Sequence, residues 1–105
     1  MKPEVTLYID TSEINTAKVG VETGGKRFEK SFASRRLKSQ TVLPLIESML
    51  TENKLKLTDI TGIFVATGPG SFTGLRVGAT VANALGYLLR IPVNGKKALA
   101  IPIYS

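Results

Sequence analysis

The stretch Gly68-Pro69-Gly70-Ser71-Phe72-Thr73-Gly74-Leu75-Arg76-Val77-Gly78 decides the fold of this chain. It follows the apolar, β-branched run Ile63–Thr67 and leads into a helical pattern that continues to Leu89. A strand, a glycine-rich turn and a helix are therefore predicted here. Glycine tolerates positive φ and proline fixes its own φ, which suits a tight backbone path. Because helix N-termini also bind anions, the turn is either a phosphate cradle or a closely packed structural corner.

General phosphate-binding and nucleophile motifs do not match this turn. A Walker A loop ends in Gly-Lys-Ser/Thr, and the turn contains no lysine. The dinucleotide fingerprint needs a shorter spacing than that of Gly68, Gly70 and Gly74. A nucleophile elbow has glycines two positions before and after its serine, whereas Ser71 has other residues at both positions.

The same turn closely resembles the signature of the bacterial TsaB (YeaZ) proteins, which help to make the threonylcarbamoyl-adenosine modification of tRNA. Leu7–Ser12 is similar to the opening strand of that family and its Asp-Thr turn, and Leu43–Leu50 resembles its first helix. Leu57–Ile60 resembles the connector before the signature strand. The resemblance extends over about residues 5–100. The family commonly has a histidine before the first helix, where this chain reads Lys38–Thr41.

The resemblance implies one lobe of a protein that normally has two. We expect residues 1–105 to form this single lobe, with the second family lobe absent. The implied function is that of a non-catalytic scaffold subunit in the modification of tRNA at position 37. The implied partners are the related threonylcarbamoyl transferase and an ATPase subunit, with tRNA contacted only through the complex.

The order of elements predicts an α/β fold with a five-stranded mixed sheet. An antiparallel meander of three strands is expected around Val5–Ile9, Ala17–Val21 and Phe28–Phe32, with a turn at Thr23–Gly25. A helix over Val42–Asn53 follows, with Thr41 as N-cap and Pro44 in the first turn. Ile63–Thr67 reads as a strand buried on both faces. A short last strand is expected at Ile91–Val93, and a third helix over Ala98–Tyr104 is considered. This is the order of one ribonuclease-H-like lobe of the actin-like superfamily.

Composition limits the chemistry of the chain. Its 105 residues include no cysteine and no histidine, which excludes disulfides, thiolate zinc sites and cysteine nucleophiles. No metal-ligand spacing is found. The start of the chain lacks the apolar core of a signal peptide, and the run Val77–Leu89 is shorter than the roughly 20 residues of a membrane span. A cytoplasmic protein without a membrane span is expected.

The net charge of +6 is concentrated in part between Lys26 and Lys38. One interpretation is a surface for RNA or an acidic partner, which makes a small basic RNA-binding module one alternative function. The other interpretation is a solvated hairpin and loop, which we favour because no RNA-recognition signature is present.

The helix after the signature carries a stripe of small residues. Gly74, Gly78, Ala82 and Gly86 recur every four positions and share one face. Glycine within a helix costs about 0.5–1 kcal/mol relative to alanine, so the stripe needs a packing partner. That partner is either the protein's own sheet or another protein. Since the resemblance implies that the first two helices contact the transferase, we predict an interface at this face. Its predicted residues are Gly74, Arg76, Gly78, Ala82, Leu85 and Gly86, and the chain alone is expected to form a homodimer through its helices.

Candidate residues for a cofactor lie at the strand end and in the turn. Asp10, Gly68, Gly70 and Ser71 are the candidates, and they support the first alternative to the scaffold function, a nucleotide-binding, actin-like phosphotransferase domain. Asp10 stands without a second carboxylate near the turn, and a local turn role explains it better. Ser71 lacks a histidine partner. The prediction is therefore no catalytic residue, no metal and no cofactor.

Overall fold

The fold is known from a computed structural model that describes residues 3–33 and 39–96. The described strands are β1 (Val5–Asp10), β2 (Thr16–Thr23), β3 (Lys26–Ala33) and β4 (Gly62–Val65). The helices are α1 (Ser39–Glu52), the short 3₁₀ helix η1 (Leu57–Asp59) and α2 (Phe72–Leu89). The considered helix over Ala98–Tyr104 lies outside the described residues.

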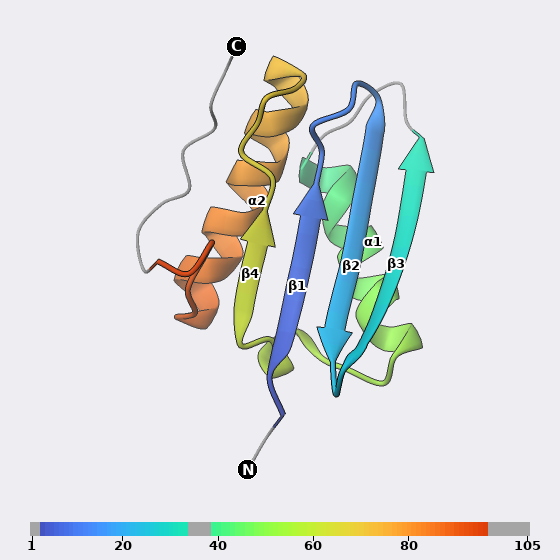
Figure 1. The fold of residues 1–105 in the computed structure, drawn as a ribbon, viewed down its shortest axis with the longest axis vertical. Coiled ribbons are helices and arrows are strands. Elements are labelled where there is room, and N and C mark those ends of the chain that lie inside the picture. Colours follow the sequence, from blue (N-terminus) through green and yellow to red (C-terminus); the bar gives the residue numbers. More distant parts are fainter. Residues whose placement is uncertain (1–2, 34–38, 97–105) are drawn as a thin grey trace.

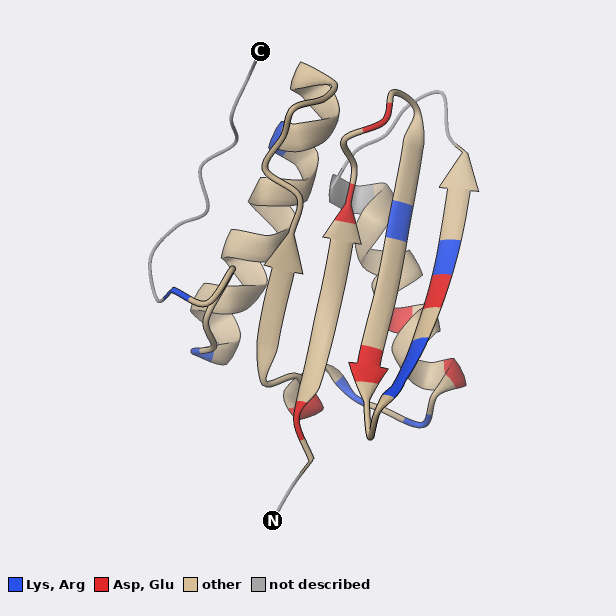
Figure 2. Ribbon diagram, in the orientation of Figure 1, with Lys and Arg blue, Asp and Glu red and all other residues tan. Residues whose placement is uncertain are grey.

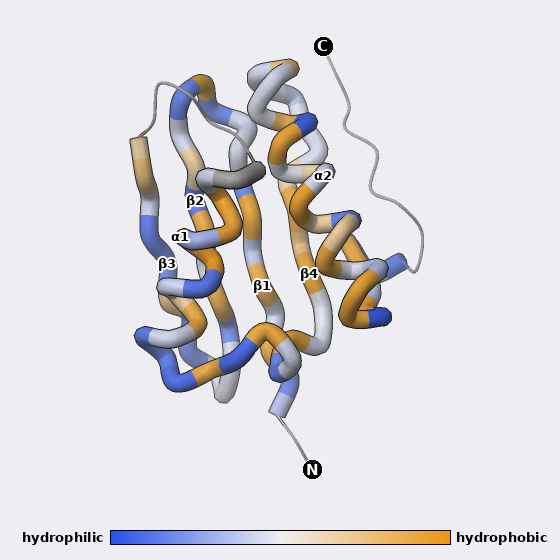
Figure 3. The backbone as a smooth tube through the Cα atoms, turned by 180° about the vertical axis from the view of Figure 1, so that it is seen from behind, coloured by the Kyte–Doolittle hydropathy of each residue, from blue (hydrophilic) through white to orange (hydrophobic). Residues whose placement is uncertain are grey.

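The four strands form one mixed sheet in the order β3-β2-β1-β4. β1 pairs antiparallel with β2, and β2 pairs antiparallel with β3, so the predicted meander is confirmed. β4 pairs parallel with β1 on the other side. Both long helices cover the same face of this sheet, as the views from the front and from behind show (Figures 1 and 3). The described residues therefore form two layers, and the second face of the sheet carries no helix.

Alternating apolar residues build the core between the sheet and the helices. Leu7 pairs with Val21 and Ile9 with Val19 in the β1–β2 register, and all four are buried. Because strand side chains alternate between the two faces, this register turns one row of apolar residues toward the helices. The helical side of the core consists of Val42, Ile46, Met49 and Leu50 from α1 and Val81, Ala82 and Leu85 from α2.

The prediction of a fifth strand at Ile91–Val93 is wrong. Of these three residues only Val93 forms β-bridges, one to Ile63 and one to Lys96. The chain turns directly afterwards, with φ 53° at Asn94 and 77° at Gly95. The Asn94 side chain continues the ladder beside β4 instead. Its Oδ1 accepts from the Val65 N–H at 2.8 Å, and its Nδ2 donates to the Val65 carbonyl at 3.1 Å. The side-chain amide of Asn94 thus makes the two hydrogen bonds to Val65 that the backbone of a further strand residue would make.

Two further predictions about local structure are corrected. β4 is buried on one face only, since Phe64 lies on the helix-free face with 54% of its surface exposed. α1 begins at Ser39, so Thr41 lies within the helix and is not its N-cap. Pro44 consequently follows five helical residues and lies beyond the first turn. A proline there removes one hydrogen bond of the helix.

Candidate functional site

The glycine-rich turn packs directly against the end of β1. The Thr11 hydroxyl is fully buried and donates to the Gly74 carbonyl at 2.5 Å. The Ser71 N–H donates to the Ser12 carbonyl at 2.7 Å. These two bonds fix the first turn of α2 on the loop that follows β1. The strand end and the helix start, about sixty residues apart in sequence, therefore form one corner.

The glycines of the turn are required because the start of α2 lies so close to the loop after β1. A Cβ at Gly70 would lie 2.5 Å from the Ser12 carbonyl oxygen, and one at Gly74 would lie 2.1 Å from that of Thr11. At Gly78 it would lie 2.4 Å from Thr11 Oγ1. Real Cβ atoms do not approach other atoms so closely. Of the two interpretations of the turn, this geometry supports the closely packed corner.

The predicted cofactor residues are engaged within this corner. Asp10 is half-buried, and its Oδ1 accepts from the Ser12 N–H at 2.9 Å and from Ser12 Oγ at 2.5 Å. Ser71 caps α2 by accepting from the Gly74 N–H at 3.3 Å. Gly68, whose φ is 124° and whose peptide bond to Pro69 is cis, leads the chain into the turn. Asp10 thus has the local turn role that its sequence context predicts.

Residues 3–33 and 39–96 contain no cluster of side chains that could bind a metal ion. No three Asp or Glu residues of these ranges come together in a way that could hold an ion. Within the same ranges, no helix is long and apolar enough to cross a membrane.

The small-residue stripe of α2 faces the protein's own sheet. Gly74 and Gly78 contact the Thr11 segment, and a Cβ at Gly86 would lie 2.5 Å from Val93 Cγ2. Ala82 is fully buried and Leu85 is 6% exposed. The predicted partner contact by these five residues is therefore corrected: the stripe is internal packing, because it has to let α2 approach β1 and β4. Only Arg76, of the six predicted interface residues, is exposed.

The side of α2 opposite the small-residue stripe exposes large apolar side chains, which the sequence analysis did not predict as interface residues. Phe72 is 54% exposed, Tyr87 83% and Leu88 72%. Arg76 lies among them, with its guanidinium carbon 5.6 Å from the centre of the Phe72 ring. Leu43 on the neighbouring helix α1 is also exposed. Positions 72, 76, 80, 84 and 87 recur every three or four residues and therefore share one face of the helix, and this spacing is the sequence signal that could have predicted the exposed surface. We call Phe72, Arg76, Thr80, Ala84, Tyr87 and Leu88 the outer stripe.

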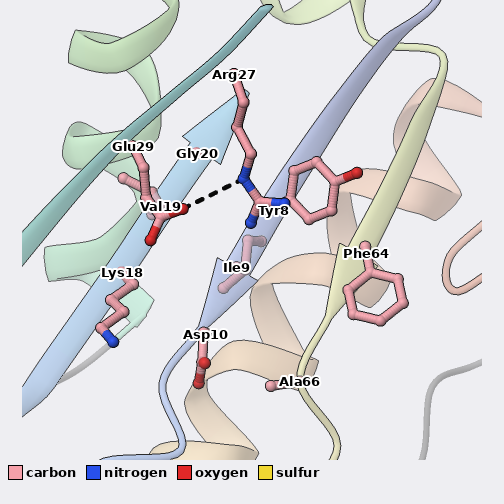
Figure 4. A pocket seen from close by; sticks show the side chains of 10 residues that line it. All are labelled: Tyr8, Ile9, Asp10, Lys18, Val19, Gly20, Arg27, Glu29, Phe64 and Ala66. Carbon is pink, nitrogen blue, oxygen red and sulfur yellow. Dashed lines mark hydrogen bonds and ion pairs between the residues drawn. The ribbon is translucent and has the colours of Figure 1, made fainter. Parts of the chain in front are cut away.

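A second exposed region lies on the helix-free face of the sheet. Here the Arg27 guanidinium carbon lies 4.0 Å from the centre of the Tyr8 ring, and the Phe64 ring centre lies 5.9 Å from that of Tyr8 (Figure 4). The Tyr8 hydroxyl donates to Glu22 Oε2 at 2.8 Å. This hydrogen bond to a carboxylate, with a smaller contribution from burial, raises the pKa of Tyr8 above its usual value. Arg27 also donates to Glu29 Oε2 at 3.2 Å.

These side chains surround a shallow hollow of about 410 Å³. It is lined by Tyr8, Ile9, Asp10, Lys18, Val19, Gly20, Arg27, Glu29, Phe64 and Ala66. Arg27 is the part of the basic stretch Lys26–Lys38 that reaches this hollow, and residues 34–38 of that stretch lie outside the described residues.

These features define an α/β lobe in which the glycines of the turn serve packing, with exposed apolar side chains on α2 and on the open face of the sheet. Comparison with protein families gives a match over residues 27–104 to the model of TsaD, described as tRNA N6-adenosine threonylcarbamoyltransferase. The chain belongs to this family.

Within it, the chain is similar to bacterial proteins called tRNA threonylcarbamoyladenosine biosynthesis protein TsaB. The protein of Buchnera aphidicola (subsp. Schizaphis graminum) is 32% identical over 98 residues, 93% of this chain and 46% of the relative. That of Escherichia coli is 38% identical over 61 residues, 58% of this chain and 26% of the relative. The chain thus spans less than half the length of these relatives.

Solved structures give the same result for the fold. YeaZ from Pseudomonas aeruginosa superposes with a TM-score of 0.79 at 30% identity, over 86% of this chain and 42% of that one. A second structure, of an uncharacterized protein with similarity to peptidase YeaZ from the same organism, has a TM-score of 0.80 at 29% identity. It covers 94% of this chain and 43% of the other. The resemblance to the TsaB (YeaZ) proteins is therefore confirmed.

Proposed function

We propose that this chain acts in the threonylcarbamoyl-adenosine modification of tRNA as a non-catalytic scaffold subunit. Its relatives are biosynthesis proteins of this modification by name, and its family model is that of the transferase. In this proposal it pairs with the transferase in the cytoplasm, an ATPase subunit completes the complex, and tRNA is contacted through the assembled complex.

The outer stripe of α2 carries this proposal. Phe72, Tyr87 and Leu88 expose more than half of their surfaces to solvent, and exposed apolar groups of this kind mark protein interaction sites. Tyrosine and arginine are enriched among residues that dominate binding energy. α1 lies beside α2 on the same face of the sheet (Figure 3). Together the two helices present a surface for a helical partner, with the small-residue stripe holding α2 in place from below.

The corner at Asp10 favours scaffolding over the phosphotransferase alternative. The Ser71 backbone N–H donates to the Ser12 carbonyl. The Ser71 hydroxyl caps the helix by accepting from the Gly74 N–H. A phosphate cradle needs such N–H groups to point at the ligand. In this turn the Ser71 N–H instead donates to the Ser12 carbonyl in the loop after β1, and the Gly74 N–H donates to the Ser71 hydroxyl.

A charge placed on the outer stripe tests the proposed interface. We expect Tyr87→Glu to weaken binding to the transferase subunit of the same host by about tenfold or more, because the loss of a tyrosine anchor commonly exceeds 1.4 kcal/mol. Ile14→Glu is the matched control, since Ile14 is similarly exposed, at 74%, in the loop between β1 and β2. Calorimetric titration measures both. Equal affinities for the two variants would refute the interface.

The same surface supports the proposal that the isolated chain forms a homodimer. Without the transferase, the outer stripes of two copies can cover each other around a two-fold axis. Light scattering should then show a dimer for the unaltered chain and a monomer for Tyr87→Glu. A dimer that persists in Tyr87→Glu would place the contact elsewhere.

A further inference from the structure

The segment after α2 contains a dipeptide with a chemistry of its own, Asn94-Gly95. Of the four asparagines of the chain, only Asn94 is followed by glycine. An asparagine side chain ends in an amide whose carbonyl carbon, Cγ, can be attacked by the backbone nitrogen of the next residue. Glycine has no Cβ to hinder this approach and leaves the backbone free to reach the required geometry. Asn94 is therefore the asparagine of this chain that is most prone to spontaneous deamidation.

The fold engages the Asn94 side chain with β4 and so opposes this reaction. Its Oδ1 accepts from the Val65 N–H at 2.8 Å, and its Nδ2 donates to the Val65 carbonyl at 3.1 Å. The Asn94 backbone N–H also donates to the Ile63 carbonyl at 2.8 Å. Both polar atoms of the amide are thus bound, and the amide has to leave Val65 before Cγ can swing to the Gly95 nitrogen.

The position of the turn allows it to open while the core stays folded. Gly95 and Lys96 are exposed, and the turn lies at the outer edge of the sheet, beside β4. Its anchor is Val93, which is 5% exposed and packs against α2 close to Gly86. Exposed segments with few buried contacts open at a lower free energy than the core of the same protein. Release of Asn94 therefore requires only a local opening.

The electrostatic surroundings of the turn are free of acidic residues. No Asp or Glu occurs after Asp59 in the sequence, and Figure 2 shows β4, α2 and the turn that follows α2 without acidic positions. Lys96 directly follows the dipeptide, and a neighbouring cation favours a deprotonated, attacking nitrogen. Deamidation would place a carboxylate in a part of the chain that otherwise has none.

We propose that Asn94 is a deamidation site whose rate is set by the opening of its hydrogen-bonded pair with Val65. In the open state the Gly95 nitrogen gives its proton to a solvent base and attacks Asn94 Cγ, which forms the new N–C bond of a succinimide ring. The Cγ–Nδ2 bond breaks, and Nδ2 takes up a proton and leaves as ammonia. Water then opens the ring at either carbonyl, which yields aspartate or isoaspartate at position 94. This site is independent of the proposed scaffold function.

The product cannot restore the native pair with β4. A carboxylate has no N–H, so the Val65 carbonyl loses its donor, and a negatively charged oxygen takes the place of that donor. Isoaspartate in addition routes the backbone through the former side chain. Because ammonia is lost, the change does not reverse. Asn94 is thus a one-way switch that exposes the Val65 backbone groups at the edge of β4.

Peptide mass spectrometry of the full chain tests this gating. Trypsin cuts after Lys and Arg, so the four asparagines fall in separate peptides, with Asn94 in residues 91–96. The protein is incubated at mildly alkaline pH with and without a denaturing concentration of guanidinium chloride. In denaturant we expect this peptide to gain the mass of deamidation. Asn15, which is exposed but followed by threonine, is the internal control and should stay intact. In the native protein the rate at Asn94 should be at least about tenfold lower.

Two buried valines separate local opening from global unfolding. Val93→Ala weakens the anchor of the turn and should raise the native rate at least about threefold. Val42→Ala removes the same methyl groups from a similarly buried valine on α1 and should leave the rate at Asn94 unchanged. The comparison of native and denatured rates in the unaltered chain decides the gating even where a variant does not fold.

Hydrogen exchange tests the consequence for β4. The deamidated chain carries one more negative charge and is separated by ion exchange. Its Val65 amide should exchange about fivefold faster than in the unaltered chain, as expected for the loss of one hydrogen bond.

Four results would overturn the proposal. The first is an equal rate at Asn94 in the native and the denatured chain. The second is deamidation of Asn15 as fast as that of Asn94 in denaturant. The third is an equal acceleration by Val42→Ala and Val93→Ala, which would assign the reaction to global unfolding. The fourth is unchanged exchange of the Val65 amide after deamidation.

Discussion

Replacement of Gly74 by alanine should destabilise the protein, although alanine is the better helix former. The gain in helix propensity is about 1 kcal/mol. Against it stands the added Cβ, which would lie 2.1 Å from the carbonyl oxygen of Thr11. That oxygen belongs to the backbone and is held by the corner, so it cannot move aside as a flexible side chain would. Overpacking of this kind costs about 1–3 kcal/mol, which leaves a net loss of about 0–2 kcal/mol after the gain in helix propensity. Because the obstacle is a backbone atom, we expect the upper half of this range, about 1–2 kcal/mol.

Thermal unfolding measures this loss. For a domain of this size, 1 kcal/mol corresponds to roughly 4–8 °C in Tm, so Gly74→Ala should melt about 4–16 °C below the unaltered protein. Gly62→Ala is the control, because no atom lies within 4 Å of a Cβ built there. If Gly74→Ala melts at or above the temperature of the unaltered protein, the close approach of α2 to β1 is wrong.

A double-mutant cycle separates the two atoms of Thr11 that the glycines avoid. At Gly78 the obstacle is Thr11 Oγ1, at 2.4 Å from the added Cβ. Thr11→Ala removes that atom, so its combination with Gly78→Ala should cost less than the sum of the single changes, by at least about 0.5 kcal/mol. Thr11→Ala leaves the backbone carbonyl in place. Thr11→Ala should therefore not relieve the clash in Gly74→Ala, and the hydrogen bond from the Thr11 hydroxyl to the Gly74 carbonyl couples these two positions in addition.

Three further outcomes are expected. Asn94→Asp should lower stability by about 1 kcal/mol in chemical unfolding, because it loses the donor to the Val65 carbonyl, and a variant as stable as the original would contradict this. The contribution of the Tyr8–Glu22 hydrogen bond should be complete below pH 10 and should disappear as the pH rises through the raised pKa of Tyr8; Tyr8→Phe should lack this alkaline component in unfolding measured against pH. Calorimetry with Mg-ATP should show weak binding or none, and low-micromolar affinity would favour the phosphotransferase alternative.

Local patterns in the sequence predicted most of the fold. The alternation of Val5, Leu7 and Ile9 indicated β1 correctly, and the two glycines after Thr23 indicated the β2–β3 hairpin. α2 ends at Leu89 as predicted, and it begins at Phe72, within the glycine-rich stretch. Each of these features depends on neighbours a few positions away. The relevant physics, side-chain periodicity and turn conformation, is therefore contained in short windows.

The errors concern contacts between distant segments. The small stripe was recognised, but its partner, Thr11, is 63 positions from Gly74, and periodicity shows a face without showing what covers it. The apolar run of β4 indicated burial on both faces, whereas the described residues cover only one. The side chain of Asn94 takes the place of a strand backbone beside β4, and no sequence pattern predicts such a substitution.

The pairing of Asn94 with β4 has a consequence for how copies of the protein can associate through their sheets. The outer edge of β4 is occupied by residues 92–94, so no foreign strand can add there. Among the described strands this leaves the edge of β3. Through the described strands, therefore, one molecule can pair with one other copy by its β3 edge, and both edges are then consumed. Growth of an open-ended fibril through the described strands is thereby blocked, and the charges of Lys26, Arg27, Glu29 and Lys30 make even the first pairing unfavourable.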